Sequence, residues 1–144
     1  MRRLMRSRSG SASLLFFGLF FLLLLLGMLV TEMGGVLEGY DCAMSVLQRS
    51  INSAVEANMD EAYRSDHILR LKVDAAKADF AAFSNADLPD KYTLTIRSVT
   101  GSASPPSLIA TGTVTFPTLF SQFGIRDVTV GFTVKAENFA VDGR

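Results

Sequence analysis

The chain has 144 residues, of which 49% are hydrophobic, and its 14 basic and 14 acidic residues give no net charge. This length suits one small domain together with a membrane element. Cys42 is the only cysteine, which excludes an internal disulfide and a cysteine-based metal site. Pairing of Cys42 with another chain stays open, but a buried, unreactive thiol is the favoured interpretation.

The N-terminal part of the chain divides into a basic leader and an apolar run. Residues 1–11 carry four basic side chains and no acid: Arg2, Arg3, Arg6 and Arg8. The next 19 residues, Ala12–Val30, contain no charge, and as a helix they are about 28 Å long, close to the thickness of a bilayer's hydrocarbon core. We expect residues 12–30 to form a transmembrane helix. Removal by signal peptidase is disfavoured, because Glu32 and Met33 stand where small residues are needed.

Charge on the two sides of this run predicts the topology. Four of the 14 basic residues are the leader arginines. Beyond Val30 the chain has 10 basic and 14 acidic residues, which is a net charge of −4. By the positive-inside rule, the leader stays in the cytoplasm and residues 31–144 form an extracytoplasmic domain of a single-pass protein of the cell membrane. The acidic balance of that domain gives no reason to expect nucleic acid as a partner; membrane lipid is the expected surrounding of the apolar run.

Apolar residues recur every three or four positions after the span, which predicts that the helix continues outward as an amphipathic helix. They are Met33, Val36, Leu37, Tyr40, Met44, Leu47, Ile51, Ala54, Val55, Met59, Ala62 and Tyr63. Gly34, Gly35 and Gly39 form a soft spot in this helix, since each costs about 1 kcal/mol relative to alanine. Ser65-Asp66 then reads as the N-cap of a second helix over 67–83, and residues 85–90 read as a loop.

The period changes to two in the last third of the chain, which predicts β-strands. Alternation runs over 92–97, 108–116 and 128–136, with a Gly-Ser-Pro connection at 101–106 and a longer loop at 117–124 that holds Leu119, Phe120 and Phe123. Three strands with short links favour an antiparallel meander covered by a helix on its apolar face. The expected fold class is therefore α+β. The Phe-bearing loop serves as a lid on the core or as an interface patch.

Residue types that carry chemistry do not fall into a known pattern. His67 is the only histidine and reads as solvated, and Asp60-Glu61 point to different sides of a helix. Asn85, Asp87 and Asp90 fit turn chemistry better than the spacing of a calcium loop. We expect no catalytic residue, no cofactor site and no metal site, and hence no enzyme.

The order of these elements resembles the TadE/TadG-like pseudopilins, type IV pilin-like proteins of tight-adherence pilus systems. The resemblance is carried by the basic leader Arg6–Ala12 with its Gly10, the unbroken span, Glu32, the small-residue stretch Tyr40–Ser53, and the strands near 92–99 and 128–136. It implies a pilin-like fold, cleavage of the leader between Gly10 and Ser11, and other pilin-like subunits or assembly proteins as partners. Leu15 stands where such chains usually carry Glu, which implies a minor subunit.

We therefore expect a structural subunit or assembly component of a type IV or Tad-type pilus or a related secretion machine, which works by lateral packing of its helix. Small residues allow close helix approach in lipid, and the inner half of the amphipathic stripe projects beyond a three-stranded sheet. The expected helix-packing interface is Gly18, Gly27, Met33, Val36, Leu37, Tyr40 and Met44. The alternatives are an anchored extracytoplasmic binding module, acting through its sheet edge or Phe loop, and an accessory subunit of a membrane complex.

The topology yields a direct prediction. Because the arginine cluster precedes the span and the acidic surplus follows it, Arg144 is expected outside the cytoplasmic membrane. A reporter enzyme that works only in the cytoplasm, fused after Arg144, should be silent in intact cells. Strong activity of that fusion would reverse the predicted orientation.

Overall fold

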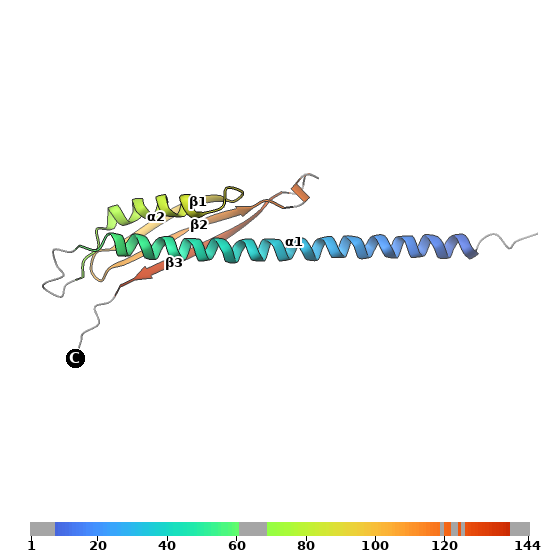
Figure 1. Cartoon of the computed structure of the whole chain (residues 1–144), viewed down its shortest axis with the longest axis horizontal. Helices are drawn as coiled ribbons and strands as arrows, with labels where there is room; N and C mark the ends of the chain where they lie inside the picture. Colours follow the sequence, from blue (N-terminus) through green and yellow to red (C-terminus); the bar gives the residue numbers. More distant parts are fainter. Residues whose placement is uncertain (1–7, 61–68, 119, 122–123, 125, 139–144) are drawn as a thin grey trace, which may run out of the picture. The chain divides into compact units, whose positions relative to one another are not determined.

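A computed structural model describes residues 8–60, 69–118, 120–121, 124 and 126–138 of the chain, with side chains from Ala12 onward. The elements follow in the order α1 (Arg8–Ala57), α2 (Val73–Asp87), β1 (Thr93–Ser102), β2 (Ser107–Phe116) and β3 (Val128–Glu137) (Figure 1). The chain forms two compact units, Met1–Gly35 and Val36–Arg144, and α1 contributes to both. The fold class is α+β, as predicted.

Helix α1 is continuous over 50 residues, in agreement with the absence of proline before Pro89. It ends at Ala57, whereas the apolar pattern predicted helix as far as Tyr63. The physical reason lies in Asn58, whose side-chain amide donates a hydrogen bond to the carbonyl oxygen of Ala54 at 2.9 Å. That bond satisfies a carbonyl at the helix end and leaves the backbone free to turn.

Helix α2 begins later than predicted. Leu71 lies in an antiparallel bridge with Met59, and the backbone N–H of Lys72 donates to the carbonyl oxygen of Asn58 at 3.0 Å. The backbone of residues 71–72 is therefore paired with residues 58–59, which follow α1, and the helix starts only at Val73. The predicted cap at Ser65-Asp66 lies outside the described residues. At its other end α2 reaches Asp87, so residues 85–87 of the loop predicted at 85–90 are helical and residues 88–90 are not.

The three strands form one antiparallel sheet in the order β1-β2-β3, which confirms the predicted meander. β2 pairs with β3 over its whole length, from Ser107 opposite Glu137 to Phe116 opposite Val128. It pairs with β1 from Ser107 opposite Ser102 to Thr115 opposite Thr93. Between Ile96 and Ser98 the register of β1 shifts by one residue, which makes Arg97 the extra residue of a β-bulge. Because of that shift, Val99 rather than Ser98 continues the apolar side of β1.

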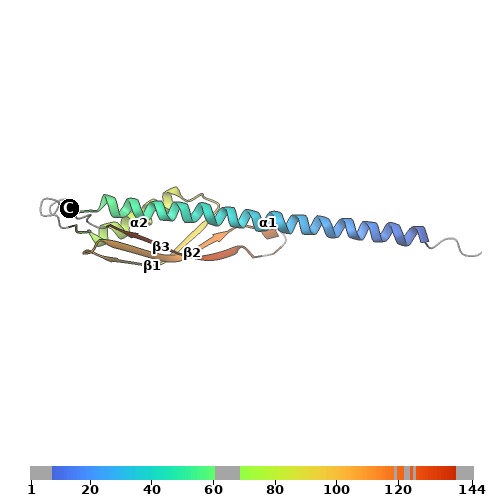
Figure 2. The ribbon, with the colours of Figure 1, turned by 90° about the horizontal axis from the view of Figure 1, so that it is seen from below.

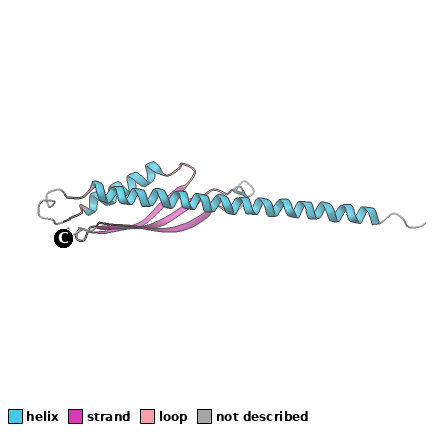
Figure 3. Ribbon diagram, turned by 60° about the horizontal axis from the view of Figure 1, so that its bottom comes forward, coloured by secondary structure: helices cyan, strands magenta, loops and turns pink. Residues whose placement is uncertain are grey.

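The core of the Val36–Arg144 unit lies between the helices and one face of the sheet, as Figures 2 and 3 show for α2 and the sheet-facing part of α1. Its largest fully buried side chains are Phe80, Phe116, Leu47, Ile51, Leu108 and Val134. All inward positions of β2 are buried. The outer half of the predicted amphipathic stripe thus packs on the sheet, as expected.

Gly39 and Gly112 are among the glycines where an added side chain would meet close neighbours. A Cβ on Gly39 would come within 3.1 Å of the Phe116 ring and of the Tyr92 hydroxyl. Gly39 therefore allows α1 to approach the end of β2 closely. The prediction that the helix is weak at this residue is wrong. On β2, a Cβ on Gly112 would collide with the carbonyl oxygen of Thr95 and approach the Phe132 ring to 2.8 Å.

Gly112 and Gly131 give a matched pair of substitutions on neighbouring strands. Gly112→Ala should lower the free energy of unfolding by about 3 kcal/mol, because the new methyl overpacks the site against backbone. Gly131→Ala meets nothing closer than the Gly112 carbonyl oxygen at 3.9 Å and should raise stability by about 0.5–1 kcal/mol. Denaturant titration of the full chain in detergent, followed by circular dichroism, measures both. Equal stability of the two variants would contradict the packing described.

Candidate functional site

Within the described residues, the exposed large hydrophobic side chains all lie on α1. The large hydrophobic side chains from Leu14 to Val30 are between 44% and 78% exposed. Over its most apolar window the helix has a mean hydropathy of 2.8, and none of that window is buried. By length and composition this one helix could span a membrane. Exposed apolar surface of this extent marks contact with lipid or with a partner.

Four of the predicted site residues lie in the N-terminal half of α1. Gly10 and Ser11 belong to its first turn. Gly18 and Gly27 have nothing within 4 Å of the position that a Cβ would take. Both glycines therefore expose helix backbone, which is the surface that close helix packing in lipid requires.

The other five predicted interface residues differ in their exposure. Met33 and Leu37 are 60% and 63% exposed, and Val36 is half-buried. Tyr40 and Met44 are partly buried and pack against the core of their own unit. Met33 and Leu37 thus remain available to a partner, whereas Tyr40 and Met44 already have intramolecular neighbours.

Cys42 is exposed, so the expectation of a buried thiol is wrong. The residue after it, Ala43, is buried, and the buried positions of α1 then continue through Leu47 and Ile51. Since a helix turns by 100° per residue, Cys42 falls just outside the buried face. The apolar character of the thiol misled the sequence-based prediction, whereas the spacing of its neighbours would have placed it correctly.

Two of the residues weighed for metal binding, Asn85 and Asp87, make contacts of another kind. Asn85 lies in α2 and donates to the carbonyl oxygen of Ala81 at 2.7 Å. Asp87 ends α2, where its carboxylate lies 3.9 Å from the Arg49 guanidinium. Within the described ranges no group of three or more His, Cys, Asp or Glu side chains could hold a metal ion. His67 and Glu61 lie outside those ranges.

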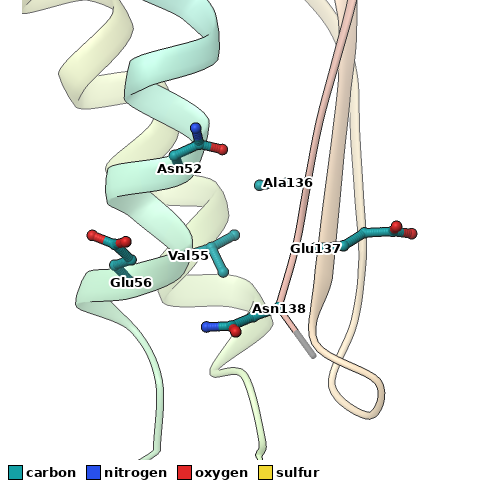
Figure 4. Close-up of a pocket in the computed structure, with 6 residues that line it drawn as sticks. All are labelled: Asn52, Val55, Glu56, Ala136, Glu137 and Asn138. Carbon is teal, nitrogen blue, oxygen red and sulfur yellow. The ribbon is translucent and has the colours of Figure 1, made fainter. Parts of the chain in front are cut away.

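A pocket of about 280 Å³ opens between the last turns of α1 and the end of β3. It is lined by Asn52, Val55, Glu56, Ala136, Glu137 and Asn138. Figure 4 shows the two carboxylates on opposite sides, with Glu56 and Glu137 directed away from each other. Glu137 also forms an ion pair with Lys135. The pocket therefore offers no pair of converging acids for catalysis or cation binding.

The loop between β2 and β3 was weighed as a lid or an interface patch. Its described residues include Thr118, which is buried and whose backbone N–H donates to the Asp127 carboxylate at 3.4 Å. Phe120 is half-buried, and Leu119 and Phe123 lie outside the described residues. The loop thus contributes buried surface to its own unit through Thr118.

Comparison of the chain with known protein families, with curated proteins and with solved structures finds no match. Its function therefore has to be inferred from the surfaces described above.

The exposure of Cys42 can be measured directly. A water-soluble maleimide should modify the folded chain at Cys42 in detergent, with one label per chain, because no other thiol exists. Intact mass spectrometry before and after denaturation measures the extent of labelling. Labelling that appears only after denaturation would contradict the position of Cys42 on α1.

Proposed function

We propose that the chain is a structural, membrane-anchored, pilin-like subunit or assembly component of a type IV or Tad-type pilus or a related secretion machine, with no enzymatic activity. One observation carries the proposal: a single helix, α1, supplies both an exposed apolar run and the helix that completes the core of a small α+β unit. A simple anchor needs no such continuity, because a flexible linker would join it to a folded domain equally well.

Lateral packing of apolar helices supplies the mechanism. Lipid tails are as apolar as leucine, so association depends on close van der Waals contact at small residues. Gly27, Thr31 and Gly35 are spaced four residues apart, and the Thr31 hydroxyl donates to the carbonyl oxygen of Gly27 at 2.9 Å. This internal bond satisfies the hydroxyl, so Thr31 can enter an apolar contact without an unpaired donor.

The contact extends beyond the span to residues that the fold leaves exposed. Met33 and Leu37 are exposed and lie one helical turn apart, since four residues make about one turn. In an assembly these two side chains pack against a neighbouring helix. The basic leader that precedes α1 supports an N-terminus in the cytoplasm and an α+β unit outside.

Cysteine crosslinking tests this function. In a Cys42→Ser background, Met33→Cys and Leu37→Cys should each form a disulfide with a cysteine placed at the same positions of another pilin-like chain, when an oxidant is added to native membranes. Met44→Cys is the matched control, because Met44 lies on the same helix but packs against its own core. Its crosslinking should be at least about tenfold weaker, since exchange of that contact requires local opening of the fold.

Two outcomes would contradict the proposal. Absence of crosslinks at both Met33 and Leu37, in membranes where the chain is abundant, favours an anchored binding module that works alone. Equal crosslinking at Met44 would show random collision in the bilayer instead of a defined helix contact.

A further inference from the structure

One stretch of α1 lies between the two surroundings that support this helix. The uncharged run that ends at Val30 is long enough to cross the hydrocarbon core of a bilayer, and the first buried residue after it is Gly39. Residues 31–38, here called the joint segment, are all exposed or half-buried. As a helix these eight residues are about 12 Å long. The joint segment therefore follows the part that lipid can cover and precedes the part that the core of the α+β unit covers.

Two adjacent glycines stand in the middle of the joint segment. A Cβ on Gly34 or on Gly35 would meet nothing within 4 Å, so no close packing within the described chain requires glycine there. Each of them makes the helix about fivefold less favourable than alanine would, because glycine loses more backbone freedom when it becomes helical. Gly39 differs, since a side chain there would meet Phe116 and Tyr92. The pair thus weakens the helix without serving the packing of its own chain.

A weak helix has different consequences inside and outside lipid. Gly18 and Gly27 also have nothing within 4 Å of a Cβ, but they belong to the uncharged run. A broken backbone hydrogen bond in hydrocarbon finds no new partner, which makes opening costly there. Water can pair with the opened backbone of Gly34 and Gly35, and a helical stretch of only eight residues is marginal in water. Opening is therefore easier at this pair than at the two glycines of the run.

Two further observations fall close to the same place. The Thr31 hydroxyl donates to the carbonyl oxygen of Gly27 at 2.9 Å, and such a bond to the preceding turn weakens a helix slightly and often bends it. The division between the two compact units of the chain comes directly after Gly35. Both observations place the weakest support of α1 around the glycine pair.

We propose that Gly34-Gly35 is a conformational joint, at which α1 opens and recloses reversibly while the helix on either side stays intact. Opening breaks the backbone hydrogen bonds that span the pair, and water takes their place. The joint lets the α+β unit incline at the membrane surface independently of the tilt of the span. It follows from this chain alone and does not depend on the proposed function.

A partner helix would close this joint. Met33 and Leu37 stand on either side of the glycine pair and are 60% and 63% exposed. A neighbouring helix that packs against both side chains needs them one turn apart on an intact helix, so it binds the closed form better and shifts the equilibrium toward it. This consequence rests on the proposed function: an assembled subunit is rigid, whereas a single subunit bends at the joint.

Spin labels on the two sides of the pair measure the joint directly. Leu22→Cys and the native Cys42 are 20 positions apart in the sequence, about 30 Å along an unbroken helix. In the full chain, highly diluted in phosphatidylcholine bilayers, pulsed electron paramagnetic resonance gives the distribution of distances between the two labels. Gly34→Ala together with Gly35→Ala should narrow this distribution at least about twofold, because alanine favours the closed helix.

The matched control replaces the two glycines of the uncharged run. Gly18→Ala together with Gly27→Ala should leave the distance distribution unchanged, since lipid already keeps the helix closed there. Equal widths for the chains with glycine and with alanine at 34 and 35 would overturn the joint. Narrowing by the control pair as strong as that by the joint pair would also overturn it.

Hydrogen exchange locates the opening along the helix. In the same bilayers, the backbone amides of residues 35–38, whose helical hydrogen bonds span the glycine pair, should exchange at least about tenfold faster than those of residues 47–51 in the buried part of α1. The two alanine substitutions should slow exchange at 35–38 about tenfold or more, because each removes about a fivefold penalty on the closed form. Exchange that the alanines leave unchanged would contradict opening at this pair.

The joint and the proposed function fail separately. Crosslinks at Met33 or Leu37 in a chain whose label distances are equally narrow with glycine and with alanine would overturn the joint and leave the proposed function in place. A distribution that alanine narrows, without any crosslink, would support the joint and refute helix packing. Where both hold, the crosslinked chain should show the narrow distribution, and a broad one would refute closure by a partner.

Discussion

The seam between α1 and the sheet is the contact on which the Val36–Arg144 unit depends. Ala43, Leu47, Ile51 and Ala54 follow each other at steps of four and three along α1, and each is at most 1% exposed. Burial of one leucine or isoleucine of this kind stabilises the fold by about 1.5–3 kcal/mol. A three-stranded sheet needs such a cover to fold, so the helix that carries the apolar run is also an indispensable part of the core.

That double role decides which surfaces remain for partners. Tyr40 and Met44 are used by the fold, and Gly39 brings the helix so close to Phe116 and Tyr92 that no partner side chain could enter there. The residues left exposed are apolar along the first unit and at Leu37, and small and hydroxylated on the far face of the sheet. The proposed helix contact therefore uses the apolar residues that the fold leaves exposed.

The sheet could be predicted from the sequence because its signal is local. From Ala110 to Phe116 in β2, small or apolar residues alternate with threonine, and every inward residue is buried as expected. The start of α2 could not be predicted, because Leu71 is held by Met59 twelve residues earlier, and by a hydrogen bond of its N–H to the carbonyl oxygen of Ala103. The threonine rows on the outer side of the sheet, such as Thr93, Thr115 and Thr129, were missed for a similar reason: single threonines are ordinary in strands, and only the register across three strands brings them together.

The bulge at Arg97 has a consequence for how the sheet ends. Without this one residue, Leu94, Ile96 and Val99 would follow a strict alternation, and β1 would become a straight strand with the same inward side. Such a strand would expose an unbroken row of backbone donors and acceptors at the sheet edge, ready to recruit a strand from another chain. Arg97 interrupts this row of backbone groups and adds a positive charge at the edge of the sheet. At the opposite edge, the side chain of Gln48 donates to the carbonyl oxygen of Lys135 at 2.9 Å. A side chain of α1 therefore occupies a backbone acceptor of β3. Both edges of the sheet are thereby protected against strand-by-strand growth into a fibre.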